Sequence, residues 1–297
     1  MTKNKTLNQA LFCSAIIHQP HALKAFLAAE NLSQSIVLTD DIWVQTSKLV
    51  SDGSVQVSGL LSDLVEVPKL SDIRIRRTLE RGIYPLAYNA LLQWHDDKGF
   101  NNIFNNYLKI SASHQEYLSH NVTILLAFNA LYPRLNELQR KPFIERVTEF
   151  ITSTFGSKSA DLVLNHKRFT FKDLFDVSIQ QPGFFGHNLI TLAWIMRSHS
   201  MIEKKLLIAL NYNLYVQSTS SLEDPDDGVD IEIFNKSVGF ESKEYFVKKI
   251  NSLIFDTRSN LHQITLADAL GYLWEQFPED RESISRLADY YRRTLEK

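Results

Sequence analysis

The chain has 297 residues, of which 44% are hydrophobic and 11% aromatic, and this apolar content excludes a mainly disordered or fibrous protein. Its 32 Lys and Arg residues nearly balance 34 Asp and Glu residues, so it lacks the basic excess that nucleic acid or an anionic membrane attracts. The single cysteine, Cys13, excludes an intramolecular disulfide and a cysteine-rich metal site. We predict one cytoplasmic domain over residues 1–297 that binds neither nucleic acid nor membrane.

The N-terminal segment imitates a secretion signal, because Lys3 and Lys5 precede an apolar run over 10–17. His18 and Pro20 interrupt that run before any small-residue cleavage site. An ordinary first helix is therefore expected there. No other run reaches the roughly 18 apolar residues that a membrane-spanning helix needs.

Low glycine and proline content and long stretches of Leu, Ala, Ile, Phe, Glu and Lys predict an all-α fold. The least regular segment lies near 31–75, where β-branched and small polar residues over 33–39 and 54–59 predict a short hairpin or loops in an irregular insertion. Apolar periodicity predicts helices over 7–17, 21–30, 84–96, 119–131, 140–154, 187–198, 201–216, 242–255, 262–275 and 280–296.

Several common cofactor and catalytic motifs are absent. The sequence contains no Gly-x-Gly-x-x-Gly, Gly-x-x-x-x-Gly-Lys-Ser/Thr, Gly-x-Ser-x-Gly, His-Glu-x-x-His or Glu-x-x-His. Standard dinucleotide, P-loop, hydrolase, zincin and ferritin-like di-iron sites therefore lack their signatures.

Three histidines stand in the same local context. His120, His187 and His262 each open a segment that is apolar almost all round a helix. A helix that is apolar on every side is buried, so a side chain in its first turn can point into the protein interior. The positive end of the helix dipole disfavours imidazolium, and neutral imidazole is the form that binds a metal or acts as a general base. We predict that these residues form a catalytic or metal-binding cluster around a buried pocket, the alternative being hydrogen-bonded core positions.

His21 repeats this context less cleanly, since it follows Pro20 and opens the apolar segment 22–29. It is a candidate fourth member, and His18 is the alternative. Asp268 stands in an otherwise apolar helix turn, where it would orient a histidine of another segment or pair with a buried arginine.

Amide residues follow the three histidines directly. Asn121, Asn188 and Gln263 could cap the exposed helix amides or hold a histidine tautomer.

The three histidine segments resemble the questin oxidase-like family, whose members include Baeyer–Villiger-type and ring-cleaving oxygenases of aromatic polyketides such as anthraquinones. The similar stretches are Ser-His-Asn-Val-Thr-Ile-Leu-Leu-Ala-Phe at 119–128, Phe-Phe-Gly-His-Asn-Leu-Ile-Thr-Leu-Ala-Trp at 184–194 and Asn-Leu-His-Gln-Ile-Thr-Leu-Ala-Asp-Ala-Leu at 260–270. They occur in the family's order, over roughly residues 115 to 275.

The resemblance implies a helical oxidoreductase that acts on a flat aromatic or polyketide-type substrate, with NADPH implicated for some members and a histidine-bound non-haem iron for others. His120, His187 and His262 would be active-site or metal ligands and His21 a possible fourth, while Phe185 and Trp194 would wall the substrate pocket. Iron-using members are thought to add a modified lysine ligand, and the only lysine after His262 is Lys297.

Two other functions are compatible with the sequence. One is a non-catalytic helical interaction or regulatory protein that kept the fold and lost the ligands. The other is a helical fold of the haem-oxygenase or metal-oxidase kind built on another ligand set.

Overall fold

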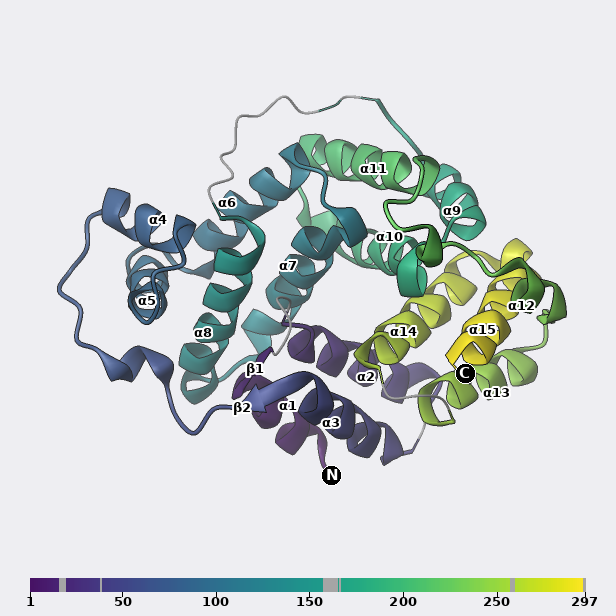
Figure 1. Cartoon of the computed structure of the whole chain (residues 1–297), viewed down its shortest axis with the longest axis horizontal. Coiled ribbons are helices and arrows are strands. Elements are labelled where there is room, and N and C mark those ends of the chain that lie inside the picture. The colour runs from purple at the N-terminus through teal and green to yellow at the C-terminus, as the bar shows by residue number, and fades with distance from the viewer. Residues whose placement is uncertain (16–19, 38, 157–164, 166, 257–259, 296–297) are drawn as a thin grey trace.

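The computed structural model describes residues 1–15, 20–37, 39–156, 165, 167–256 and 260–295. These residues fold into an array of helices (Figure 1), which confirms the all-α prediction. The only sheet in the described part is an antiparallel pair of short strands, β1 (Cys13–Ala15) and β2 (Ser54–Gln56), with Cys13 opposite Gln56.

The α-helices in chain order are α1 (Lys3–Leu11), α2 (Ala22–Ser35), α3 (Asp41–Gly53), α4 (Asp72–Glu80), α5 (Leu86–Lys98), α6 (Phe100–Ser113), α7 (His120–Leu131), α8 (Glu137–Thr154), α9 (Phe171–Gln180), α10 (His187–Ser198), α11 (Lys204–Thr219), α12 (Ile231–Lys236), α13 (Lys243–Phe255), α14 (Leu261–Gln276) and α15 (Arg281–Leu295). Two short 3₁₀ turns matter for the site: η2 (Tyr117–Ser119) precedes α7 and η4 (Phe184–Gly186) precedes α10.

Four helices form the centre of the molecule. Helix α2 contacts α7, α7 contacts α10, α10 contacts α14, and α14 contacts α2, which closes a ring. Because 10 of the 12 residues of α7 and 11 of the 12 residues of α10 are buried, these helices have no solvent-facing side. Helices α4 and α5 lie at one end of the molecule and α12, α13 and α15 at the other (Figure 1).

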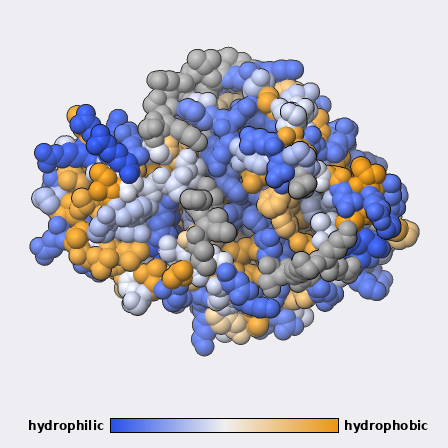
Figure 2. All heavy atoms as spheres, in the orientation of Figure 1, coloured by the Kyte–Doolittle hydropathy of each residue, from blue (hydrophilic) through white to orange (hydrophobic). Residues whose placement is uncertain are grey.

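The surface is mixed in character. Hydrophilic side chains cover much of the face shown in Figure 2, and hydrophobic ones gather at the end that carries α4 and α5. Leu64 and Ile73 are exposed there. No helix in the described part is long and apolar enough to cross a membrane.

The structure corrects the expected boundaries at the N-terminus. Helix α1 ends at Leu11 rather than at 17, because Cys13–Ala15 turns into the strand that pairs with β2; positions 16 and 17 lie outside the described residues. Of the hairpin or loops expected over 33–39 and 54–59, the first segment holds no hairpin strand in its described part, since α2 continues to Ser35. The expected irregular segment 31–75 contains α3, which buries Trp43 and Leu49 on one face.

Besides α3, four helices were not predicted: α4, α6, α9 and α12. Asparagines at 101, 102, 105 and 106 give α6 a polar appearance, although Phe100, Ile103, Phe104, Tyr107 and Leu108 are buried at helical spacing. Helix α9 is short and begins at a capping box formed by Thr170 and Asp173.

Candidate metal centre and adjoining cavity

The turns before α7 and α10 share an unusual backbone. Leu118 and Ser119 have φ of 70° and 52° ahead of His120, and Phe185 and Gly186 have φ of 45° and 71° ahead of His187. A non-glycine residue in this left-handed region costs on the order of 1 to 3 kcal/mol, and such strain clusters at functional sites. The shared sequence context of the two histidines thus corresponds to a shared way of beginning a helix.

The other two histidines also stand at helix starts. His21 is the N-cap residue of α2, and His262 is the second residue of α14, whose N-cap is Asn260. The ring of four central helices therefore brings all its N-terminal ends to one place.

The four imidazole rings form a closed cycle. Neighbouring ring centroids lie 4.7 Å apart for His21 and His120, 4.9 Å for His120 and His187, 4.9 Å for His187 and His262, and 4.8 Å for His262 and His21. The rings of His120 and His262, opposite each other in the cycle, are 6.4 Å apart. The predicted cluster of His120, His187 and His262 is thus assembled, and His21 completes it; His18, the alternative, lies outside the described residues.

Hydrogen bonds fix the tautomers of two rings. His187 Nδ1 donates to the Phe184 carbonyl oxygen, and His262 Nδ1 donates to Asn260 Oδ1 over 2.8 Å. Neither oxygen can donate, so Nδ1 carries the hydrogen in both rings and Nε2 keeps its lone pair. The buried Nε2 of His262 has no hydrogen-bond partner among the described residues.

His120 lies between two neighbours. Its Nε2 atom is 3.1 Å from Nε2 of His21 and 3.0 Å from Nε2 of His187. A ring nitrogen has either one hydrogen or one lone pair, so only one of these contacts can be a well-directed hydrogen bond. One of the two close nitrogen–nitrogen contacts of His120 therefore has no hydrogen to form a hydrogen bond.

Burial holds these imidazoles neutral. It lowers the pKa of His120 and His187 well below the ordinary value of 6.5 and that of His262 to about 3. Neighbouring histidines and the cation of Lys24 add to the shift for His120, and Lys24 also does so for His187 and His262. All three rings are therefore in the form that ligates a metal.

Lys24 is itself unusual. It lies on α2, is fully buried, and donates to Thr123 Oγ1 over 3.4 Å, with no carboxylate partner among the described residues. Burial lowers its pKa to about 7. The sequence reasoning missed Lys24, although a lone lysine inside the apolar segment 22–29 is a visible signal. Lys297, the only lysine after His262, lies outside the described residues.

The donor set fits a metal ion. One ligand atom from each of His21, His120 and His262 lies within 4.8 Å of the others. His187 is not a member of this group of three, but its Nε2 atom lies 3.0 Å from Nε2 of His120. Imidazole binds first-row metals at about 2.1 Å, which separates two nitrogens by about 3.0 Å at a right angle and by about 3.4 Å in a tetrahedron. The observed 3.0 and 3.1 Å match neighbouring positions of a six-coordinate ion.

A cavity of about 480 Å³ opens beside the histidines. His21, His120, His262, Phe184 and Asn260 line the part nearest the cluster. Apolar residues of β1, α2, α3 and α14 supply much of the rest, including Ala15, Ala22, Leu49 and Leu261. This size and lining are typical of a small-molecule site.

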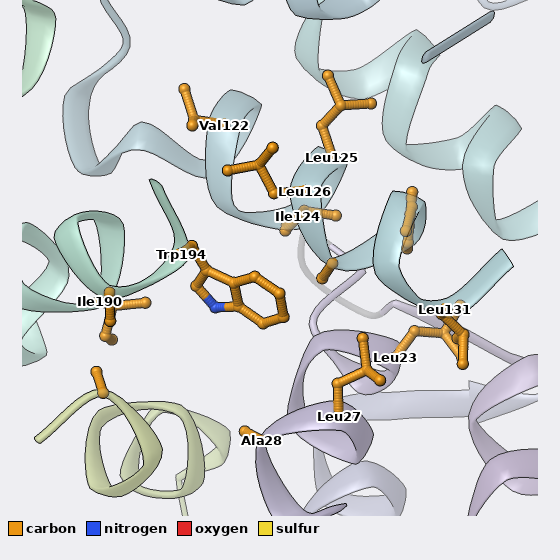
Figure 3. Packing of buried hydrophobic residues seen from close by; sticks show 14 of the residues in the cluster. Leu23, Leu27, Ala28, Val122, Ile124, Leu125, Leu126, Leu131, Ile190 and Trp194 are labelled. Carbon is orange, nitrogen blue, oxygen red and sulfur yellow. The ribbon is translucent and has the colours of Figure 1, made fainter. Parts of the chain in front are cut away.

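The aromatic residues predicted to wall the pocket lie elsewhere. Trp194 is 4% exposed, and Figure 3 shows its indole in the core near Ile124 of α7 and Leu27 of α2. Phe185 stacks on the His262 ring at 5.4 Å. Neither belongs to the cavity lining, which takes Phe184 instead.

Asp268 pairs with an arginine. Its carboxylate accepts hydrogen bonds from Arg197 Nη1 and Nη2 at 2.5 and 2.7 Å, and the Arg197 guanidinium stacks over Tyr272. Of the two roles that the sequence left open, the structure shows the ion pair.

The amide side chains that follow the three histidines donate hydrogen bonds to backbone carbonyls of the preceding segments. Asn121 Nδ2 donates to the His114 carbonyl, Asn188 Nδ2 to the Gln181 carbonyl and Gln263 Nε2 to the Ile254 carbonyl. Gln263 also accepts from the Asn260 N–H in the cap of α14. The tautomer of His262 is held instead by Asn260, which the sequence reasoning did not single out.

No protein-family model, curated protein or solved structure matches this chain.

Proposed function

We propose that this chain is a metal-dependent oxidoreductase of the questin oxidase-like type, acting on an aromatic or polyketide-type small molecule. One observation carries the proposal: four imidazoles from four helix starts meet in one cluster, and three of them, His21, His120 and His262, line a largely apolar cavity. A histidine left in the core for packing alone would be expected to have its buried nitrogens paired, whereas His262 Nε2 has no partner in the described part.

In this proposal His21, His120, His187 and His262 hold the metal through Nε2. We expect iron, because imidazole suits iron and four nitrogen ligands leave open positions for oxygen or substrate. Bound iron supplies redox chemistry with oxygen, which organic side chains lack. NADPH, the other cofactor that the resemblance implies, remains a prediction.

The remaining residues shape the environment of the reaction. The apolar walls bind the flat body of the substrate and exclude water. Phe184 has two functions here, since its carbonyl orients His187 and its side chain belongs to the cavity lining. When it is protonated, Lys24 places a positive charge near the cluster, which opposes protonation of the histidines.

The test is the iron content of anaerobically reconstituted protein, measured by plasma mass spectrometry. We expect near-stoichiometric iron in the wild type and in His199→Ala, an exposed histidine outside the cluster, and a large loss in His187→Ala. Thermal melting of each variant separates loss of metal from loss of fold. Iron-loaded protein is then incubated aerobically with anthraquinone-like compounds, and product is followed by mass spectrometry.

Absence of iron from the wild type, or equal iron in all three proteins, would contradict the metal centre. Iron binding without turnover of any aromatic compound would leave the metal centre and contradict the substrate class.

A further inference from the structure

The side-chain oxygen of Asn260 accepts two hydrogen bonds. Oδ1 accepts from the backbone N–H of His262 over 3.0 Å and from His262 Nδ1 over 2.8 Å. A backbone N–H only donates, so the atom facing it must be the amide oxygen, and this fixes which way the amide is turned. The position of Nδ2 follows from it.

The hydrogen bonds of Asn260 in the described part of the chain are made by its backbone N–H and by Oδ1. Its side-chain nitrogen, Nδ2, has no protein acceptor there. It is also not among the fully buried side-chain atoms that lack a partner, so it is accessible to solvent. Asn260 lines the cavity together with His21, His120 and His262, so the cavity is the space beside this residue that a ligand could occupy.

We propose that Asn260 Nδ2 donates a hydrogen bond to an oxygen of the molecule bound in the cavity. The site would therefore select an apolar molecule that carries a neutral acceptor, such as a ring carbonyl, over the matching hydrocarbon. The inference rests on the proposed function only in taking the cavity as the ligand site; it does not require a metal.

The same residue links ligand and cluster. Oδ1 holds the His262 ring with Nε2 toward the other histidines, while Nδ2 holds the ligand oxygen. Asn260 is thus a positioning residue that sets the ligand's acceptor oxygen beside the histidine cluster.

The chain permits a matched substitution. Asn260→Asp keeps an oxygen for the His262 N–H and Nδ1–H, and Asp caps a helix about as well as Asn, but both amide hydrogens are removed. Asn251→Asp makes the same chemical change on α13, where Asn251 Nδ2 donates to the Val247 carbonyl and lies outside the cavity lining. Thermal melting verifies that both variants fold.

The probes are 1-tetralone and tetralin, which share a shape and differ by one carbonyl oxygen. Their affinities are measured by calorimetry on the full chain, as purified and after chelation. We expect the wild type and Asn251→Asp to bind tetralone about tenfold more tightly than tetralin, the worth of one well-made hydrogen bond. In Asn260→Asp we expect that preference to disappear while tetralin affinity stays the same.

A second readout needs no substitution. The side-chain amide signals of Asn260 in a nitrogen-15 correlation spectrum should shift on addition of tetralone and stay in place with tetralin.

A tetralone preference that survives in Asn260→Asp, or a wild type without any preference, overturns the inference. Binding of neither compound overturns it together with the cavity as ligand site. Tetralone binding with the expected preference in a chain that takes up no iron would support Asn260 while contradicting the metal centre.

Discussion

His120 and His187 lie 67 positions apart in the sequence, and their Nε2 atoms are 3.0 Å apart in the fold. Each ring stands at the first position of a helix whose preceding turn contains left-handed residues. Two neutral imidazoles this close, with His187 Nδ1 already protonated, direct at least one lone pair into the cluster. Either a hydrogen on His120 Nε2 or a metal ion bound by both nitrogens satisfies this contact.

Metal affinity should depend little on pH. Burial lowers the pKa of His120, His187 and His262 far below 6.5, so none of these rings needs to lose a proton before it binds metal at pH 5.5. We expect the affinity for Co²⁺, measured by competition with a chromophoric chelator, to fall by less than about tenfold between pH 7.5 and 5.5. Three histidines of ordinary pKa would lower it by about a thousandfold over this range, and that result would contradict the neutral cluster.

Lys24 should make stability rise with pH. The pKa of Lys24 is about 7 in the folded protein, whereas the ordinary value, which applies to the unfolded chain, is 10.5. Between these two pH values the unfolded chain holds a proton that the folded chain lacks, so raising the pH favours folding. Relative to Lys24→Met, the metal-free wild type should gain about 3 kcal/mol in unfolding free energy from pH 7 to pH 9.5. Urea denaturation at the two pH values measures this.

Substitution of Lys48, an exposed lysine on α3, by Met is the control and should leave the pH dependence unchanged. Parallel pH profiles for wild type and Lys24→Met would show that Lys24 is not a buried amine.

Gly186 should be intolerant of a side chain. The φ of Gly186 is +71°, and a Cβ atom there would lie 2.5 Å from Leu266 Cδ1. Leu266 is fully buried. Gly82→Ala is the matched control, since its φ is +57° but the nearest atom to its Cβ would be 3.8 Å away. We expect Gly82→Ala to cost about 1 kcal/mol through backbone strain and Gly186→Ala a further 1 to 3 kcal/mol, roughly, through overpacking.

Chemical denaturation compares the two glycine variants. Because Gly186 precedes His187, Gly186→Ala should also weaken metal binding. Equal stability losses would mean that Leu266 moves aside at no cost.

Asp268 should matter for stability and not for metal. Asp268→Asn removes the charge partner of Arg197 in a pair whose carboxylate is 3% exposed, and breaking such a pair costs about 3 kcal/mol. Asp176→Asn, in a surface pair with Lys172, should cost less than about 1 kcal/mol. We expect unchanged iron content in both variants; loss of iron in Asp268→Asn alone would assign Asp268 to the metal centre.

The sequence was most informative where the signal is local. A histidine at the start of a helix that is apolar on every side can be recognised from one segment, and the buried helices α7, α10 and α14 are where that pattern predicts them. The local pattern could not show that the helix starts meet, because that depends on how α2, α7, α10 and α14 pack into a ring.

Other features were hidden by composition or by distance along the chain. The asparagines of α6 concealed a regular apolar face. The pairing of β1 with β2 joins residues 13–15 to 54–56, which no local pattern reveals. Asn260 looks like an ordinary helix cap in the sequence, and its second contact, with the His262 ring, becomes visible only in the folded structure.

The proposed function requires that the histidine cluster of His21, His120, His187 and His262 binds one metal ion. Anomalous diffraction from crystals grown anaerobically with Fe²⁺ tests it most directly, using data on both sides of the iron absorption edge. We expect a single strong peak within bonding distance of Nε2 of His21, His120, His187 and His262. Iron-free density there, with the four rings still in direct contact, or a peak bonded to other residues would contradict it.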